Sequence, residues 1–328
     1  MYPISYDDVV AARGRLAPHF AASPVRHYPQ LDELVGYGIR VLVKHENHLP
    51  TNSFKVRNGT SALSALSARD PALADRGVIA ATTGNHGLGL AWAGARLGIP
   101  VTICVPLGNN PEKSAVIRSL GATLVEVGAR YDDTIAACCA MAMREGLTLV
   151  HSTNHRDVIA GAATMTAEFV EDAPALDAIV IALGGGSQAV GAAVVRDALH
   201  PALALYAVQS AEASAQHDAW HDGEARAGAP VHTFAEGVAT GSTYALTFDA
   251  LRAGLADFVL ASEGAIAQAV RDLWRITHNL PEGAGAAGLA GLHVLAPRLA
   301  GQTVGIVICG GNLDAARAVQ ILSGGTPG

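Results

Sequence analysis

One local pattern recurs along the chain: a short run of β-branched residues, a turn that contains glycine, and an alanine-rich stretch with helical spacing. It occurs at residues 39–66, 78–98, 177–199 and 304–322. Strands that alternate with helices favour parallel sheets, because each crossover lays a helix on a face of the sheet. Ligands of such sheets bind beyond the carboxyl ends of the strands. We therefore expect the four turns, which carry small or polar residues, to face one cleft.

Two further strand candidates, at 99–108 and 121–128, flank a helical stretch at 110–120. They provide enough strands for a second, smaller parallel sheet. A chain of 328 residues is long enough for two moderate domains. We predict an α/β fold with two domains, each built on a parallel-rich open sheet flanked by helices. The domains are predicted at 52–146 for the small inserted one, and at 1–51 together with 147–328 for the large one.

Composition narrows the class of partner. Charged residues make up only 16% of the chain and the net charge is −7, with no stripe of Lys or Arg. Neither nucleic acid nor an anionic membrane surface is therefore indicated, and no apolar run reaches the roughly 18 residues that a transmembrane helix needs. The four cysteines lack the paired spacing of a disulfide framework or a zinc site. These features predict a cytoplasmic protein whose partner is a small molecule.

Lys55 lies in the segment TNSFKVRNG, which follows an expected strand at Ile39–Lys44. Ser53 is the expected cap of a helix that begins beside Lys55. If the amine is buried there, loss of solvation lowers its pKa, which is what Schiff-base chemistry requires of a lysine. Most lysines at helix starts are solvated and have no chemical role. Lys55 is therefore a candidate for Schiff-base chemistry only if the other turns support it.

The third turn, in ALGGGSQAVG, joins a strand to a helix and contains three glycines at 184–186, followed by Ser187. Such a turn leaves backbone N–H groups free to bind a phosphate at the start of the helix. A tight turn without any ligand is the alternative.

A dinucleotide site is a second alternative for this turn, because Gly184, Gly186 and Ala189 match the fingerprint spacing. The strand that follows ends in Gln209 where a ribose would need an acidic residue, although Glu212 is near. The residues around the turn therefore favour phosphate binding over dinucleotide binding.

The second turn, TTGNHG at 82–87, places hydroxyl groups and backbone N–H groups at another helix start. Such a start can hold a carboxylate, which suits an amino-acid substrate. A simple capping role is the alternative for Asn85, and equally for Asn312 in the fourth turn, CGGN.

Five segments occur in the order and rough spacing of a known family: SFKVR at 53–57, TTGNHG at 82–87, GGGS at 184–187, EGAGAAGLAGL at 282–292 and CGGNLD at 309–314. On these motifs, which span nearly the whole chain, the protein resembles the serine/threonine dehydratases. These are fold-type-II pyridoxal-phosphate enzymes, related in fold to the β-subunit of tryptophan synthase.

The resemblance implies that pyridoxal 5′-phosphate binds in the cleft between the domains. Lys55 would carry it as a Schiff base and accept the α-proton of the substrate. Phe54 would pack beside its ring, Asn85 would bond its 3′-oxygen, and Cys309 would face its ring nitrogen. The phosphate would be held by Gly184, Gly185, Gly186, Ser187 and Gln188. The substrate would be bound by Ser53, Thr82, Thr83, Asn85 and His86.

The implied reaction is an α,β-elimination that converts a β-hydroxy-α-amino acid into a 2-oxo acid and ammonia. Threonine, serine and bulkier or acidic relatives are the candidate substrates. The resemblance also implies a homodimer, and the absence of a regulatory extension after the last motif suggests a catabolic enzyme. Three alternatives stay open: β-replacement or threonine-synthase-like chemistry, amino-acid racemisation, and a nucleotide-binding oxidoreductase or binding protein.

Some positions depart from the family pattern. After Arg57 the family has Gly and Ala, whereas this chain has Asn58 and Gly59, which leaves the choice of substrate open. Val56 stands where threonine synthases typically carry Asp, and Thr83 stands where serine racemases carry Ser. The synthase and racemase alternatives are disfavoured for these reasons.

No metal site is expected. Some relatives bind a divalent cation through acidic residues that are replaced here by Gln209 and Ser214. His151 and His155 have i,i+4 spacing, but their segment reads as a loop before a helix and not as a chelating helix. Glu282 aligns with a glutamate near the family's active site, and a solvated loop position is the alternative.

Overall fold

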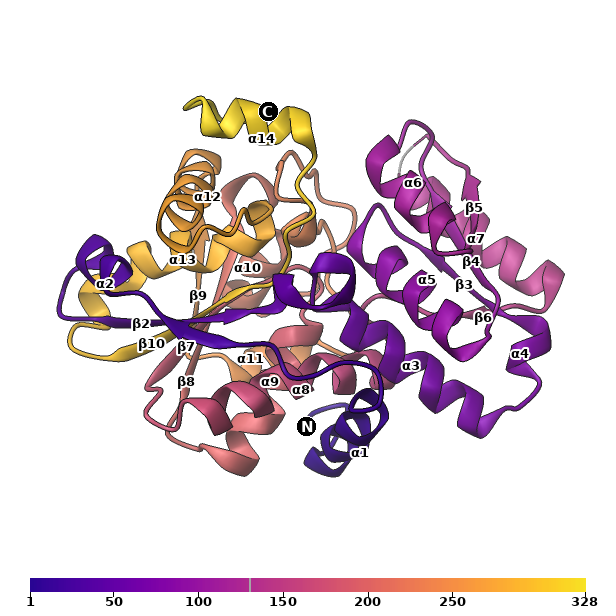
Figure 1. The fold of residues 1–328 in the computed structure, drawn as a ribbon, viewed down its shortest axis with the longest axis horizontal. Helices are drawn as coiled ribbons and strands as arrows, with labels where there is room; N and C mark the ends of the chain where they lie inside the picture. The colour runs from indigo at the N-terminus through magenta and orange to yellow at the C-terminus, as the bar shows by residue number, and fades with distance from the viewer. Residues whose placement is uncertain (130) are drawn as a thin grey trace.

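Two open sheets flanked by helices form the framework (Figure 1), as the sequence predicts. The structure is a computed structural model, and it describes residues 1–129 and 131–328. The small sheet has four parallel strands in the order β5-β4-β3-β6. These are β3 (Val78–Ala81), β4 (Val101–Val105), β5 (Thr123–Glu126) and β6 (Thr148–Leu149). Because they all run in one direction, their carboxyl ends meet at one edge.

The large sheet has six strands in the order β1-β2-β10-β7-β8-β9. These are β1 (Val25–His27), β2 (Arg40–His45), β7 (Ala178–Ala182), β8 (Ala204–Ser210), β9 (Asp257–Ala261) and β10 (Thr303–Ile308). Only β1, at one edge, runs antiparallel to its neighbour. The first and last copies of the sequence pattern are therefore neighbours, because β10 pairs with β2.

Helices cover the faces of both sheets (Figure 1). Those grouped with the small sheet are α4 (Leu73–Arg76), α5 (Asn85–Leu97), α6 (Pro111–Ser119) and α7 (Tyr131–Glu145). Those grouped with the large sheet are α1 (Tyr6–Leu16), α2 (Pro29–Val35), α8 (Arg156–Asp172), α9 (Ser187–Leu199), α10 (Ala215–Asp222), α11 (Phe248–Gly254), α12 (Glu263–Thr277), α13 (Gly283–Leu295) and α14 (Ala315–Leu322). Helix α3 (Lys55–Arg69) contacts both α5 and α8 and so lies between the two groups.

Close helix crossings hold α3 in this position. A Cβ atom added at Gly59 would lie 2.5 Å from the carbonyl oxygen of Gly89 on α5. A Cβ atom added at Gly161 on α8 would lie 2.5 Å from the carbonyl oxygen of Arg57. Neither position has room for a side chain, so the backbones of three helices touch. The Gly59 that departs from the family pattern thus has a packing role here.

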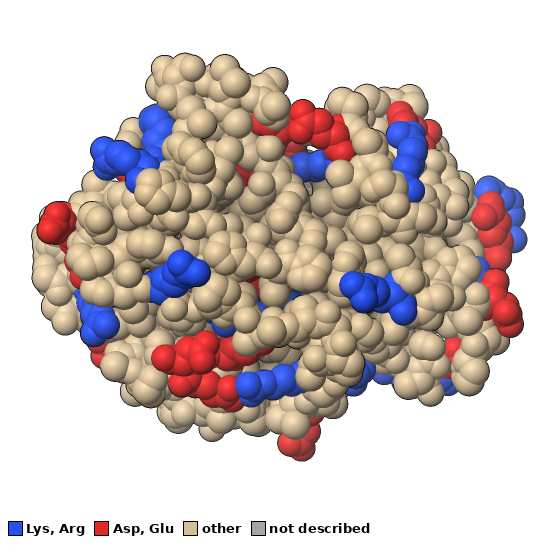
Figure 2. Space-filling view, viewed as in Figure 1, with Lys and Arg blue, Asp and Glu red and all other residues tan. Residues whose placement is uncertain are grey.

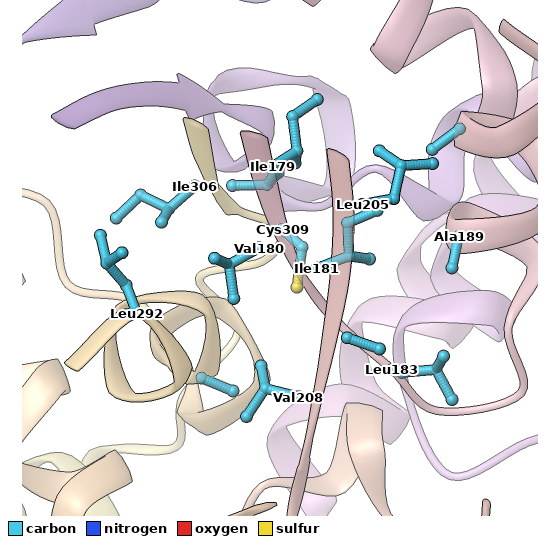
Figure 3. Close-up of a cluster of buried hydrophobic side chains, with 14 of the residues drawn as sticks. Ile179, Val180, Ile181, Leu183, Ala189, Leu205, Val208, Leu292, Ile306 and Cys309 are labelled. Atoms are coloured by element: carbon cyan, nitrogen blue, oxygen red, sulfur yellow. The ribbon is translucent and has the colours of Figure 1, made fainter. Parts of the chain in front are cut away.

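The two sheets have separate apolar cores. The larger core packs β7 and β10 against α13, and Figure 3 shows Ile179, Val180 and Ile181 of β7 near Ile306 of β10. The smaller core surrounds β3 and β4. Burial of this kind is the main favourable contribution to folding, so each sheet carries its own source of stability.

Two sequence expectations need correction. Ser53 does not cap α3: it is extended, it bridges to Gly310, and Phe54 occupies the N-cap without a side-chain hydrogen bond. Tertiary pairing with the end of β10 has overridden the local capping preference. Strand β6 lies at Thr148–Leu149 in the small sheet, although the predicted boundary at 146 places these residues in the large domain.

The distribution of charged side chains on the surface agrees with the lack of a Lys or Arg stripe in the sequence. Figure 2 shows positive and negative side chains dispersed over the visible face, with a hollow between the two lobes at the top of the view. In the described residues, no helix combines the length and the apolar character that crossing a bilayer requires.

Candidate active site

A cavity of about 1050 Å³ lies beyond the carboxyl ends of strands from both sheets. All four turns that share the sequence pattern contribute to its wall, as expected. Of the predicted site residues, those that line the cavity are Phe54, Lys55, Thr82, Thr83, Asn85, His86, Gly184, Gly185, Gly186, Ser187, Gln188 and Cys309. Ser53 does not line it: its side chain is fully buried and its hydroxyl has no hydrogen-bond partner within the described structure.

The chain has three lysines, and their surroundings differ. Lys44 is buried against Glu168, with 2.9 Å between its Nζ and Oε2 of Glu168, and Lys113 Nζ lies 2.5 Å from a carboxylate oxygen of Glu236. The described residues place no carboxylate in an ion pair with Lys55, whose Nζ lies 4.6 Å from the centre of the Phe54 ring. Burial lowers the pKa of the Lys55 amine to about 8, although Cys309 and Glu282 oppose this shift. Lys55 is therefore the lysine whose amine is available for chemistry.

Backbone pairing fixes the start of α3 against the end of β10. The Phe54 N–H donates to the Cys309 carbonyl at 3.0 Å, and the Gly311 N–H donates to the Asn52 carbonyl at 2.9 Å. These bonds flank the Ser53 bridge and hold the residues on either side of it in register. Lys55 and Cys309, which are far apart in sequence, consequently share one side of the cavity.

The glycine turn after β7 forms a tight cradle. Cβ atoms added at Gly184 and Gly185 would collide with the Gly237 carbonyl oxygen and with the Thr153 side chain. Gly186 has a φ of 98°, a left-handed conformation that favours glycine. Helix α9 begins at Ser187, and its first N–H groups have no partner within the helix. The turn thus provides backbone donors where a phosphate can approach.

The second turn follows β3. The Thr82 hydroxyl accepts a hydrogen bond from the Gly84 N–H at 3.1 Å, and α5 begins at Asn85. Asn85 is thus the first residue of the helix and not its cap, which is Gly84. The side chains of Thr83 and Asn85 are partly exposed to the cavity.

The contacts of the His86 side chain do not suit its expected role of binding the substrate carboxylate. Its Nε2 lies 3.1 Å from the Val150 carbonyl oxygen, so Nε2 must be the protonated nitrogen. Burial lowers the pKa of His86 to about 3, with a further contribution from the positive charge of Lys55. The neutral ring leaves only Nδ1, an acceptor that lacks a described partner. A carboxylate would find no donor on this ring.

Glu282 and Asn312 meet Asn85 from opposite sides. Asn85 Nδ2 lies 2.5 Å from Glu282 Oε1, and Asn312 Nδ2 lies 2.8 Å from Asn85 Oδ1. Glu282 is buried and not solvated, and burial raises the pKa of its carboxyl group. Asn312 is not a cap either, because Asp314 caps α14.

Cys309 directly follows β10 inside the larger core, and Figure 3 shows its sulfur beside Val180 and Ile181. Burial raises the pKa of its thiol, so the group is neutral at physiological pH. The cavity therefore presents an uncharged partner at this position and not a carboxylate.

Sequence reasoning missed three charged residues at the cavity. Glu236 accepts from Lys113 of α6 at 2.5 Å through Oε2 and from Arg317 of α14 at 2.5 Å through Oε1. Lys113 follows the carboxyl end of β4, and the same strand-end rule could have found it. No local sequence pattern marks Glu236 or Arg317. Tertiary structure brings both residues to the cavity.

The residues considered as possible metal ligands in the sequence make other contacts in the structure. The Gln209 amide donates to the carbonyls of Val238 and Thr240 at 3.3 and 3.4 Å. His151 and His155 precede α8, as predicted, and His151 Nδ1 accepts from the Thr153 N–H at 2.9 Å. Across residues 1–129 and 131–328, no group of three candidate metal-binding side chains occurs.

The cavity fits pyridoxal phosphate. The glycine cradle has no space for Cβ atoms but offers backbone donors for a phosphate. The Lys55 amine has the lowered pKa that a bond to an aldehyde requires. The neutral thiol of Cys309 and the Asn85 amide complete a donor set suited to a heteroaromatic ring.

Comparisons with known proteins agree with this chemistry. Residues 16–310 match the family of pyridoxal-phosphate-dependent enzymes. The chain is 34% identical to a putative threonine dehydratase of Sinorhizobium fredii, over 98% of this chain and 96% of that protein. It is also 34% identical to an L-threo-3-hydroxyaspartate ammonia-lyase of Pseudomonas sp, over 98% and 99%. A pyridoxal-phosphate-dependent aspartate racemase has a similar structure, with a TM-score of 0.91 and 26% identity over 97% and 98% of the chains.

The fold, the cavity and these relatives lead to one assignment. The chain is an enzyme of the threonine/serine ammonia-lyase type, uses pyridoxal 5′-phosphate, and belongs to the serine/threonine dehydratase family of fold-type-II pyridoxal-phosphate-dependent enzymes.

Proposed function

We propose that this protein converts a β-hydroxy-α-amino acid into a 2-oxo acid and ammonia, with Lys55 as the catalytic residue. One observation carries the proposal: among the residues that the structure describes, no carboxylate forms an ion pair with Lys55, which opens into the cavity that the glycine cradle also lines. Pyridoxal phosphate, when bound, withdraws electrons from the α-carbon of an attached amino acid and so makes its proton acidic. The roles that follow belong to the chain's own residues.

The glycine turn holds the cofactor's phosphate. Backbone N–H groups of Gly185, Gly186, Ser187 and Gln188 are the donors at the start of α9. Phe54 would pack beside the ring, and Asn85 would donate to the ring oxygen. The Cys309 thiol would face the ring nitrogen as a neutral group. A neutral partner does not force a positive charge onto that nitrogen, and this favours elimination.

Lys55 has two tasks in this proposal. Its amine would be the point where the cofactor is attached, and as a free amine it would accept the α-proton of the substrate. A pKa of about 8 leaves a substantial share of the amine neutral near physiological pH. Loss of the β-hydroxyl as water would consume one proton, which balances the α-proton that Lys55 accepts, and hydrolysis of the eliminated product would take up that water and release ammonia.

The turn after β3 receives the α-carboxylate of the substrate. Its donors are the hydroxyl of Thr83 and the backbone N–H groups at the start of α5, where the helix dipole favours an anion. The Thr82 hydroxyl orders the turn by accepting from Gly84. The His86 side chain has no donor for this purpose, so only its backbone contributes.

The substrate, the oligomeric state and the location of the protein complete the proposal. Threonine and 3-hydroxyaspartate are the first substrates to test, because the relatives' names give a threonine dehydratase and a hydroxyaspartate ammonia-lyase; serine is the third. A homodimer is supported by the family resemblance. Four free cysteines, three of them buried, are compatible with a cytoplasmic location.

A panel of single amino acids tests the proposal. The protein is loaded with pyridoxal phosphate and incubated separately with threonine, serine and 3-hydroxyaspartate, while 2-oxo acid and ammonia are measured. Release of both in equal amounts from at least one substrate is expected. Inversion of the α-carbon without ammonia would indicate racemisation, and a protein that remains colourless with the cofactor would exclude the proposal.

A further inference from the structure

The Asn85 carboxamide is bonded at both ends, and the chain of bonds has a direction. Asn312 Nδ2 lies 2.8 Å from the Thr51 carbonyl oxygen and 2.8 Å from Asn85 Oδ1. Asn85 Nδ2 in turn lies 2.5 Å from Glu282 Oε1. The bonds therefore run from Asn312 through Asn85 to Glu282.

The direction is set by an obligate acceptor. The Thr51 carbonyl oxygen can only accept, so Asn312 must turn its NH₂ group toward it. The second hydrogen of that group then points at Asn85, which must present its oxygen. A reversed Asn85 would place two NH₂ groups against each other. Glu282 Oε1 accordingly accepts from Asn85 whether or not its other oxygen carries a proton.

Counting hydrogens shows what is left for a ligand. Asn85 Nδ2 has two hydrogens, and Glu282 takes one. Asn85 lines the cavity, so its second N–H is a donor available there, while its oxygen faces away toward Asn312. Asn85 can therefore offer a ligand a donor but no acceptor.

Gly310 makes room for this arrangement. A Cβ atom at this position would collide with Glu282 Oε1 and would lie 3.1 Å from Asn85 Nδ2. The Glu282 N–H also donates to the Gly310 carbonyl at 3.1 Å, which holds the start of α13 against the end of β10. Because Gly310, the second residue of the CGGN turn, has no side chain, the Glu282 carboxylate has room beside it.

We infer that Asn312 and Glu282 are positioning residues that fix Asn85 as a hydrogen-bond donor and thereby hold the ring hydroxyl of the bound cofactor in its anionic form. A donor stabilises an oxyanion, whereas a reversed amide would accept from the protonated hydroxyl. The inference rests on the proposed cofactor contact of Asn85. It assigns a role to Asn312, which otherwise reads as a turn residue.

Two substitutions of Asn312 test the inference. Asn312→Asp has nearly the same shape but cannot donate to Asn85, and Asn312→Leu removes the donor without adding charge. Both variants remove the donor that fixes the Asn85 oxygen, and Asn312→Asp replaces it with an acceptor. We expect the visible absorbance of the loaded protein at neutral pH to shift toward the near ultraviolet, as the ring hydroxyl takes up a proton. Cofactor affinity should fall by about tenfold or more, as expected when a bond to a charged group is lost.

Glu282→Gln separates orientation from charge. The glutamine carbonyl can still accept from Asn85, while a negative charge near the ring oxygen is lost. The visible band should therefore persist and extend to lower pH than in the wild type. If Glu282→Gln behaves like Asn312→Leu, the inferred direction of the amide chain is wrong.

The outcomes distinguish the inference from the proposed function. A wild-type chain that gains no visible band with pyridoxal phosphate overturns both. A coloured wild type with variants whose bands match it overturns the inference alone. A shift in Asn312→Asp but not in Asn312→Leu would trace the effect to the added charge and would also overturn it. Thermal unfolding of the cofactor-free variants, expected within a few degrees of the wild type, excludes misfolding as the cause.

Discussion

Lys113 and Glu236 form an ion pair across the cavity, with 2.5 Å between Nζ and Oε2. Lys113 belongs to α6 beside the small sheet, and its side chain is only 8% exposed. Glu236 precedes α11 in the large-sheet half of the chain and also binds Arg317. The pair therefore links both sides of the cavity, with the lysine largely shielded from water and the carboxylate 28% exposed.

The first prediction concerns the stability of this link. Glu236→Gln leaves the buried Lys113 ammonium without an opposite charge, which should reduce the free energy of unfolding by about 1–3 kcal/mol. A double-mutant cycle with Lys113→Met, measured by urea unfolding, should give a clear coupling energy. The exposed pair Arg118–Glu126 is the control, with an expected coupling below about 0.5 kcal/mol. Equal couplings for the two pairs would contradict the prediction.

A second prediction concerns the buried charges behind Lys55. Arg57 is 1% exposed and binds Glu46 and Glu168 through four N–H···O bonds of 2.7 to 2.9 Å. Arg57→Met leaves the buried Glu46 carboxylate without a cation, while Glu168 keeps only Lys44, and should cost about 3–5 kcal/mol in urea unfolding.

Arg57→Lys keeps the positive charge and is the matched control for Arg57→Met. It should recover only a minor part of the loss, because an ammonium cannot reproduce two bidentate contacts. A variant Arg57→Lys with wild-type stability would show that charge alone, and not geometry, holds this cluster.

The third prediction concerns pH. The Lys55 amine attacks the cofactor aldehyde only when it is unprotonated, and burial lowers its pKa to about 8. The rate at which the cofactor-free protein gains colour should therefore rise with pH, reach half its maximum near pH 8, and level off above. Stopped-flow absorbance at saturating pyridoxal phosphate gives this profile. A rate that keeps rising toward the ordinary lysine value of 10.5 would show that the amine is solvated.

A fourth prediction concerns the glycine cradle. Gly185→Ala forces a Cβ atom into the Thr153 side chain and should displace the turn. Loss of even one N–H bond to a charged phosphate weakens cofactor binding by about tenfold or more. Equilibrium titration with pyridoxal phosphate measures this loss. Gly264→Ala, on α12 where a Cβ meets nothing within 4 Å, is the matched control and should bind as the wild type does.

The sequence reveals the parts of the site that local structure determines. The glycine turn at 184–186 and the turn at 82–87 follow strand patterns directly, and parallel pairing brings such ends to one edge. Each of these two turns depends on residues within a few positions of one another. Lys55, at the start of a helix, is distinguished only together with those turns, because a lysine at a helix start is usually solvated.

Contacts between distant segments are what the sequence does not reveal. Ser53 has the chemistry of a helix cap, yet pairing with Gly310 holds it extended. The partner of Lys113 lies 123 residues away, and the role of Asn312 depends on the Thr51 carbonyl. No local propensity encodes such pairs, because they arise only when the fold brings together segments that are far apart in the sequence.

The most direct test of the central claim is to identify the lysine that binds the cofactor. Reduction of the loaded protein with borohydride makes the bond between amine and cofactor permanent, and peptide mass spectrometry then locates the added mass. The chain offers only Lys44, Lys55 and Lys113. We predict modification of Lys55 alone, and no modification or 2-oxo acid release in Lys55→Ala. Modification of Lys44 or Lys113, or turnover by Lys55→Ala, would contradict the account.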